Sequence, residues 1–343
     1  MWKAVDRLLD EALTTEQFPG CAFAVGQRDK VLYKKTCGLL AKDGEKAVSS
    51  RTCYDVGDLT QVLVTTPLCL TAVEQGLLDP EDTIRRFLPD VPQDKQHITI
   101  AQLLTQTSGL SPHFLLQEEA RNHKDALAAL LRHPLAGPVG GKVNDSGMGF
   151  LLLGFLLEKV FDMPLDEAAK KFVADPLGMT RTSYLAAGTD VAPNLIRDNN
   201  GVLETGSCAD ANARYLHGVA GHSGLFTCLD DMTRYASMLA QDGRVDGGVF
   251  LSPRAVHLAI TERTRGMNAA RGYGFHITKR SNPFLGLIWP SDGYGLRDPA
   301  SGSVIALSPE DGFFAVFLTN ASTDAQRFTR LLLNAAYAGF QRV

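Results

Sequence analysis

Segments with strand character stand at both ends of the chain, and this order constrains the fold more than any other feature. Near the N-terminus, a helical period over 2–16 leads into two β-prone runs, CAFAV (21–25) and KVLYKK (30–35). After residue 245, strand character returns in RGYGFHITK, SGSVIALSPE and GFFAVFLTN, and a last helix is predicted over 323–340. We therefore expect both ends of the chain to build one sheet.

The middle of the chain has the pattern of helices joined by loops rich in Gly, Asn and Asp. Helical periods cover Leu59 to Gln75, 115–132, 148–161, 164–173 and 230–240. The order predicts one domain of α/β class (α+β layered) over residues 1–343. Segments 1–52 and 245–343 are expected to form an α/β lobe, and 53–244 an inserted all-helical lobe. The cleft between the lobes is the expected ligand site.

Composition limits the partners. The chain has 34 Lys and Arg against 38 Asp and Glu, a net charge of −4, with no cluster of basic residues. Neither a nucleic acid nor a membrane is therefore an expected partner, and a small molecule is. The longest apolar run, Gly149 to Leu157, is far shorter than the roughly 20 residues that span a bilayer. The charged N-terminal helix does not have the pattern of a signal peptide, so we expect a cytoplasmic protein.

No motif for a metal or a cofactor is present in the sequence. The six Cys show no C-x-x-C spacing and are expected to be buried thiols. His217 and His222 lie five apart in a Gly-rich loop and are a poor metal pair. G-x-G-x-x-G, P-loop and H-E-x-x-H motifs are absent as well. We expect neither a metal nor a cofactor.

Several longer strings occur in an order that one family shares. They are CYDVGDLTQVLVTT (53–66), ITIAQLLTQTSGL (98–110), DPLGMTRTSY (175–184), GVAGHSGLFTCLDDMTRYASML (218–239), LSPRAV (251–256) and SVIALSPEDGFFAVFLTN (303–320). On these strings, nearly the whole chain resembles the serine β-lactamase and penicillin-binding-protein-like family, particularly its class C-like esterases and peptidases. The resemblance implies that family's fold, an antiparallel sheet flanked by helices with an inserted all-helical lobe.

The resemblance also implies that the catalytic residues of the family have been replaced. In the family, a Ser at the start of the first long helix attacks a carbonyl, a Lys one turn later removes its proton, and a Tyr or Ser relays that proton. Alignment puts Asp58, Gln61 and Asp145 at these positions. The K-T-G or H-x-G strand motif aligns with Leu296-Arg297-Asp298 or, with a short insertion, Gly293-Tyr294-Gly295. The expectation is a fold that has lost acyl-serine chemistry.

Asp58 has two interpretations. In the string DLTQ it can be the N-cap of the helix, with Gln61 at N3 in a variant capping box that is worth about 1 kcal/mol. Alternatively, Asp58 points into the cleft and faces Asp145, because the residues they replace lie close together in the family. Two such carboxyls would act as an acid and a base. A separation of about 5 Å would indicate a retaining glycosidase, and roughly 6.5–9.5 Å an inverting one.

Other polar and aromatic residues are candidates for contact with a ligand. Gln61 can hold a hydroxyl or a carbonyl, and Arg297 with Asp298 is either a surface ion pair or a contact at the cleft edge. His222 is expected to be structural or to support the site. The remaining candidates are Tyr54, His113, Asp210, Asn212, Trp289 and Tyr294. A relocated nucleophile would have to be Ser108, in a TSGL loop, or Ser146, which has no base in its local sequence.

Three functional hypotheses follow. The first is a repurposed enzyme that uses Asp58 and Asp145 on a small polar substrate, a glycoside foremost and a lyase or isomerase substrate next. The second is a non-catalytic pseudoenzyme that holds a metabolite or peptide in the cleft. The third is residual hydrolysis through a serine or a water molecule. Two carboxyls within about 10 Å that face an open pocket would favour the enzyme, and an Asp58 turned onto its own helix would favour the second hypothesis.

Overall fold

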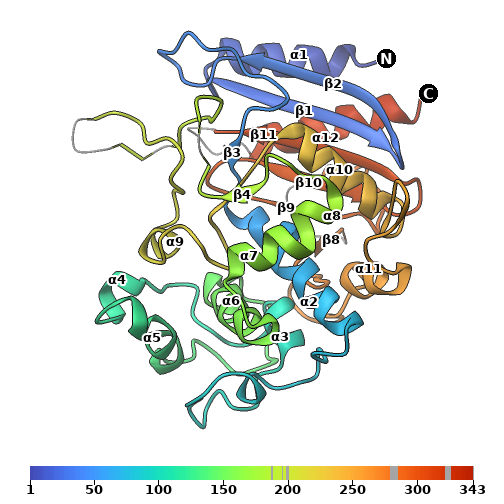
Figure 1. The fold of residues 1–343 in the computed structure, drawn as a ribbon. Coiled ribbons are helices and arrows are strands. Elements are labelled where there is room, and N and C mark those ends of the chain that lie inside the picture. The colour runs from blue at the N-terminus through green and yellow to red at the C-terminus, as the bar shows by residue number, and fades with distance from the viewer. Residues whose placement is uncertain (187, 195, 198–200, 279–284, 321–325, 343) are drawn as a thin grey trace.

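The computed structural model describes residues 1–343 except 187, 195, 198–200, 279–284, 321–325 and 343. Its main feature is a six-stranded antiparallel sheet of order β2-β1-β11-β10-β9-β8 (Figure 1). The strands are β1 Gly20–Gln27, β2 Lys30–Gly38, β8 His276–Ile277, β9 Tyr294–Arg297, β10 Val304–Ser308 and β11 Phe313–Thr319. Because β1 pairs with β11, the two ends of the chain meet at the centre of the sheet, which confirms the prediction.

Both faces of the sheet are covered, and this explains the continuous apolar run of β11. Phe313 and Phe317 belong to the core formed with α1 (Lys3–Thr14) and α12 (Gln326–Phe340). Phe314 and Val316 point into the larger core on the opposite face. A strand buried on both faces has no polar alternation. The helix α10 (Leu229–Ala240) packs on that opposite face, against β1, β10 and β11, although the predicted lobe boundary at 245 assigns it to the helical lobe.

The other elements form the helical region and two small sheets. The helices are α2 Thr66–Glu74, α3 Ile100–Leu104, α4 Leu116–Glu119, α5 Ala126–Arg132, α6 Gly147–Phe161, α7 Leu165–Ala169, α8 Asp175–Leu177, α9 Ala211–Tyr215 and α11 Pro253–Ile260. Short helical turns are η1 Gly57–Leu59, η2 Gln61–Thr65, η3 Ile84–Arg86, η4 His123–Asp125 and η5 Lys170–Ala174. One sheet holds β3 Tyr54–Asp55, β5 Leu225–Thr227 and β4 Ser183–Tyr184, and a hairpin joins β6 Arg244–Val245 to β7 Gly248–Val249.

Two predicted elements differ from the structure. The helix expected over 115–132 is split, because the chain is extended at Ala120 and the side chain of Asn122 then accepts a hydrogen bond from the Asp125 N–H to begin a new turn. The strand expected at 271–279 is reduced to β8, and its last residue lies outside the described residues. Among the described residues, no helix combines the length and the apolar character needed to span a bilayer.

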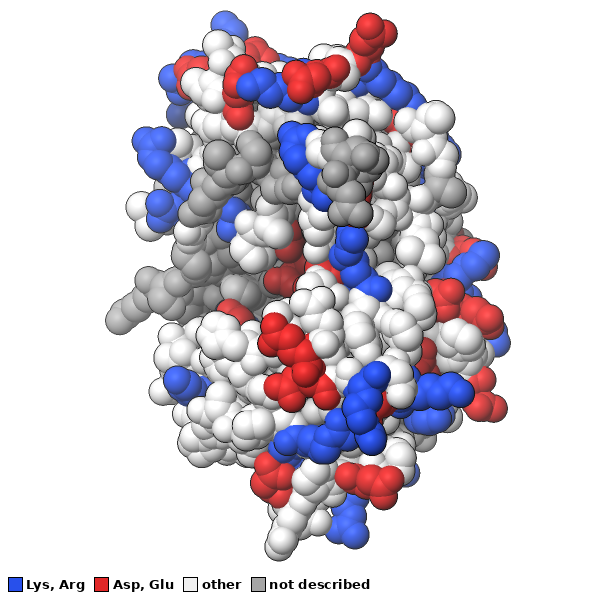
Figure 2. All heavy atoms as spheres, turned by 90° about the vertical axis from the view of Figure 1, so that its left-hand side faces the viewer, with Lys and Arg blue, Asp and Glu red and all other residues white. Residues whose placement is uncertain are grey.

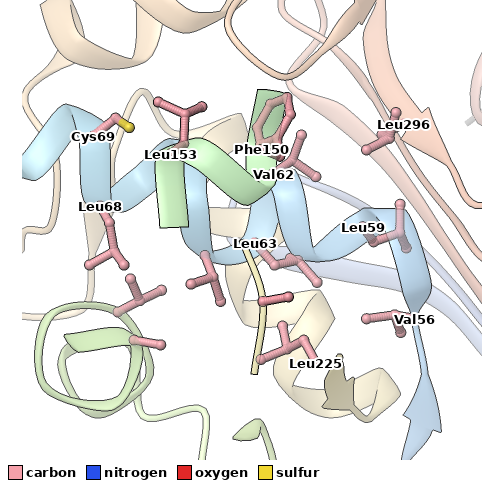
Figure 3. Packing of buried hydrophobic residues seen from close by; sticks show 14 of the residues in the cluster. Val56, Leu59, Val62, Leu63, Leu68, Cys69, Phe150, Leu153, Leu225 and Leu296 are labelled. Carbon is pink, nitrogen blue, oxygen red and sulfur yellow. The ribbon is translucent and has the colours of Figure 1, made fainter. Parts of the chain in front are cut away.

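The helix expected from Leu59 to Gln75 begins irregularly, and this segment carries Asp58 and Gln61. It opens with the 3-10 turn η1, continues as the π-helical η2 and becomes regular only in α2. Pro67 lies where η2 ends and α2 begins. Proline has no N–H, so it cannot continue the backbone hydrogen bonds of the preceding turn. Val62 and Leu63 are buried beside Phe150 of α6 and Leu225 of β5 (Figure 3). This packing fixes the segment in place, and with it the positions of Asp58 and Gln61.

Candidate active site

Asp58 lies within the opening turn of this helix and does not cap it. The N-cap position belongs to Val56, and Asp58 makes no side-chain cap hydrogen bond. Its Oδ1 instead accepts a hydrogen bond from Gln61 Nε2 at 3.1 Å. The capping-box prediction is therefore wrong. The positive φ of Gly57, 49°, begins the turn one residue earlier than the sequence pattern suggests.

Two cavities meet at Asp58. The larger has a volume of about 410 Å³, and its polar lining includes Asp55, Asp58, Asn194, Asp210, Ser223, Asp298, Ser301 and Asn320. The smaller, of about 280 Å³, is lined by Asp58, Gln61, Gln106, Asp145, Ser146, His276, Arg297 and Gln326 among others. Pro299 is shared by both, and acidic atoms are visible in a recess at mid-height of the molecule (Figure 2). Asp58 can therefore contact a ligand in either cavity.

Asp298, at the end of β9, is held directly against the backbone of Asp58. Its Oδ1 accepts from the Asp58 N–H at 3.1 Å, and its Oδ2 accepts from the Ser301 N–H at 2.5 Å. A Cβ on Gly57 would lie only 2.4 Å from Asp298 Oδ1, so a residue with a side chain would collide there. Of the two alignments of the strand motif, Leu296-Arg297-Asp298 is the one that places its last residue beside Asp58.

Burial gives this carboxyl pair unusual acidity. It raises the pKa of Asp58 to about 7, and the nearby charge of Asp298 adds to the rise. Burial also raises the pKa of Asp298, whose side chain is almost wholly enclosed. Two carboxyls that lie close together in an enclosed site do not both ionise easily. The pair can therefore hold or release a proton near neutral pH.

Asp145 lines the smaller cavity with Asp58 but has a different partner. Both of its carboxylate oxygens accept from Arg271 Nη2 at 2.8 Å. The Arg271 side chain is only 8% exposed, whereas that of Asp145 is 61% exposed. Asp145 thus compensates a buried guanidinium. Burial, reinforced by the charge of Arg271, lowers the pKa of the neighbouring His276 to about 3, so that imidazole is neutral.

Asp210 and His222 form a fixed pair beside the larger cavity. Asp210 Oδ1 accepts from the Ala213 N–H at 2.7 Å, which caps α9, and lies 2.8 Å from His222 Nε2. Burial alone would raise the pKa of Asp210, but His222 and the backbone donors outweigh it and hold that pKa below its ordinary value. His222 is buried, pairs with Asp210 and lines neither cavity, so it supports Asp210 and is not itself a ligand contact.

The structure brings Asp58, Gln61, Asp145, Asp210, Arg297 and Asp298 to these cavities, whereas the other candidates for ligand contact line neither of them. Tyr54 and Tyr294 are buried in the hydrophobic core. Asn212 joins two chain segments, accepting from the Leu116 N–H and donating to the Phe114 carbonyl. His113 is exposed outside both cavities. Trp289 is buried in the core near α12, where Nε1 donates to the Leu333 carbonyl.

Sequence reasoning missed five polar side chains of the larger cavity, those of Asp55, Asn194, Ser223, Ser301 and Asn320. Ser223 Oγ and Asn320 Oδ1 are buried and have no hydrogen-bond partner in the described part of the chain. Asp55 accepts from the N–H groups of Gly57 and Ala209, and burial raises its pKa to about 6. Only two local signals were present: Ser223 directly follows His222, and just two residues separate Asp55 from Asp58 in the string DVGD. Nothing in the sequence indicated Asn320, which follows the end of β11.

The fold and the recognised strings match one family along the chain. The family model described as Beta-lactamase matches residues 5–340. The chain belongs to the beta-lactamase family. The protein is 24% identical to the N-acetylmuramyl-L-alanine amidase of Bacillus subtilis over 356 residues, covering 93% of this chain and 80% of that one.

Solved structures show the same fold for this beta-lactamase-family protein. EstCE1, described as a hydrolase with promiscuous acyltransferase activity, superposes with a TM-score of 0.81 at 20% identity over 98% of both chains. A penicillin-binding protein homologue from Caulobacter crescentus gives a TM-score of 0.81 at 18% identity, covering 98% of this chain and 97% of that one. Relatives in the family are hydrolases that include an amidase.

Proposed function

We propose that this protein hydrolyses an acyl bond of a small polar compound with Asp58 as general base, and that it has lost the acyl-serine route of its family. The observation that supports this most directly is the position of Asp58. Its carboxyl lines two cavities, does not cap its own helix, and has a pKa raised by burial to about 7. A base with a pKa near the working pH is the most effective at removing a proton from water.

The groups around Asp58 suit this role. The Gln61 side chain donates a hydrogen bond to Oδ1 of Asp58 and so orients this carboxyl. The Asp298 carboxylate accepts a hydrogen bond from the backbone N–H of Asp58. In the proposed reaction a water molecule loses a proton to Asp58 as its oxygen attacks the acyl carbon. The carbon–oxygen or carbon–nitrogen bond then breaks, and the proton passes to the leaving group. The sequence-based pair of Asp58 with Asp145 is replaced in this proposal by Asp58 with Asp298.

Asp145 has a binding role in this proposal. Arg271 donates hydrogen bonds to both oxygens of Asp145, so Asp145 is poorly placed to deliver a proton. With Arg297, it offers charged contacts for the polar part of a substrate in the smaller cavity. The amidase and acyltransferase activities named for the relatives favour an acyl substrate, and they give no support to the glycosidase or lyase considered from the sequence.

A serine nucleophile is a weaker explanation. Ser146 lines the smaller cavity, but its Oγ donates to the Ser111 carbonyl at 2.5 Å rather than to a base. Ser223 Oγ has no hydrogen-bond partner in the described part of the chain, and therefore no base there to activate it. Ser108 is buried and lines neither cavity. Water activated by Asp58 needs no such hydroxyl.

Ligand binding without turnover is the second candidate. One observation favours it: Gln61 and Arg271 already hydrogen-bond the two carboxyls that the sequence assigned to catalysis. A pseudoenzyme would use these groups to shape the cleft.

The test is turnover of a mixed set of esters, amides, peptides and glycosides, followed by mass spectrometry. Asp58→Asn should lower the rate of an ester or amide at least about a hundredfold, since general-base catalysis contributes that much. Asp43→Asn, on an exposed residue, is the matched control and should keep the wild-type rate. Equal turnover by wild type and Asp58→Asn would contradict the role of Asp58. Ligand retention without turnover by any of the proteins would favour the second candidate.

A further inference from the structure

The larger cavity is strongly acidic. Asp55, Asp58, Asp210 and Asp298 all line it, and its described lining contains no Lys, Arg or His. Two basic side chains lie close by without lining it: His222 pairs with Asp210, and Arg297 lines the smaller cavity. Carboxyls enclosed together raise one another's energy unless a positive charge lies among them. An acidic lining by itself does not identify a ligand.

Two further atoms in the same cavity do point to a ligand. Ser223 is 2% exposed and Asn320 is 8% exposed, and Ser223 Oγ and Asn320 Oδ1 have no hydrogen-bond partner among the described residues. A buried polar atom that is left unpaired costs roughly 1–3 kcal/mol, so such atoms normally have a partner. Asn320 Nδ2 is already used, because it donates to the carbonyls of Leu40 and Pro193. The free oxygen of Asn320 can only accept.

The missing partner must therefore be a donor. An amide oxygen, a hydroxyl and several carboxyl oxygens all accept hydrogen bonds, and a primary ammonium group supplies three N–H donors together with a positive charge. A bound metal ion fits less well, because no group of three or more His, Cys, Asp or Glu side chains within the described ranges is arranged to hold one. The volume, about 410 Å³, lies in the range of small-molecule sites.

We propose that the larger cavity binds the protonated amino group of a small amine. Resting on the proposed function, this inference makes the substrate an amino ester, an amino amide or a short peptide with a free amino group. The ammonium group would lie among Asp298, Ser223 and Asn320, and the acyl carbon would lie at Asp58, where the cavities meet. Cation binding would also stabilise the ionised form of the carboxyls around it.

The test measures binding without turnover, by titration calorimetry with three probes of similar size. They are phenethylammonium, the neutral 2-phenylethanol and the anionic 3-phenylpropionate. The ammonium probe should bind at least about tenfold more tightly than the other two, and Asp298→Asn should remove most of this preference. Equal affinity for the neutral and the cationic probe would overturn the proposal.

A second variant guards against loss of folding in Asp298→Asn. Ala211 is exposed at the start of α9 and lines the cavity, so Ala211→Lys would bring an ammonium group of the protein itself to the site. It should weaken the binding of phenethylammonium at least about tenfold, an effect of 1.4 kcal/mol or more. Ala47→Lys, at an exposed position outside the cavity, is the matched control and should bind as wild type does. Unchanged affinity in Ala211→Lys would place the ammonium group elsewhere.

These outcomes separate the inference from the proposed function. Selective binding of the ammonium probe by a protein that turns over no substrate would support the cavity assignment and contradict the hydrolase. Hydrolysis of esters with and without an amino group at the same kcat/KM would support the hydrolase and contradict the cavity assignment.

Discussion

Asp58 and Asp145 line the same cavity, yet their surroundings give them opposite properties. Asp58 is enclosed beside another carboxyl, and burial raises its pKa to about 7. Asp145 is 61% exposed and holds the guanidinium of Arg271. In the proposed function, the same residue type thus serves proton transfer at one aligned position and charge compensation at the other. Environment, rather than residue identity, assigns the role.

The largest expected effect on stability is that of Asp58→Asn. The raised pKa means that between about pH 4 and pH 7 the folded state binds a proton that the unfolded state has lost, so stability falls as the pH rises. Asn removes this penalty, and the variant should be more stable than wild type by about 1–3 kcal/mol at pH 8 and by much less near pH 4. Urea unfolding at both pH values measures it. A variant less stable than wild type at pH 8 would show that burial does not destabilise the ionised carboxyl of Asp58.

Asp145→Asn should have the opposite sign and a smaller size. It leaves the buried charge of Arg271 without its partner, and the loss is expected to be about 1 kcal/mol because Asp145 is largely exposed. Thermal and urea unfolding at pH 7 measure it. The double variant Asp145→Asn/Arg271→Met should recover most of the loss, since no unpaired charge remains. If the single variant matched wild type, the contrast between the two carboxyls would not hold.

Gln61→Met should give the smallest effect. It removes the N–H donor that favours the charged form of Asp58, while it keeps the length of the side chain. The pKa of Asp58 should rise further, and the rise of kcat/KM with pH should move to higher pH. The pH profile of the reaction found in the turnover screen is the measurement. A move to lower pH would mean that Gln61 does not stabilise the carboxylate.

The fold was predictable because its signals are local. The apolar runs of β1 and β11 and the motif strings can be read directly from the sequence, and they place the strands at both ends of the chain. Of the site, the sequence indicated Asp58, Gln61 and Asp145 but misjudged their contacts. The cap was misread because Gly57 adopts a positive φ. Burial and unpaired atoms, as at Ser223 and Asn320, arise only when distant segments pack together.

The most direct measurement is an NMR titration of the aspartate side-chain carbons in the whole protein, from about pH 3 to pH 9. One carboxyl signal should titrate near pH 7, should be absent in Asp58→Asn, and should remain in Asp145→Asn. If every carboxyl in the wild type titrated below about pH 5, or if the signal near pH 7 survived in Asp58→Asn, then Asp58 would not be the proton-transferring group.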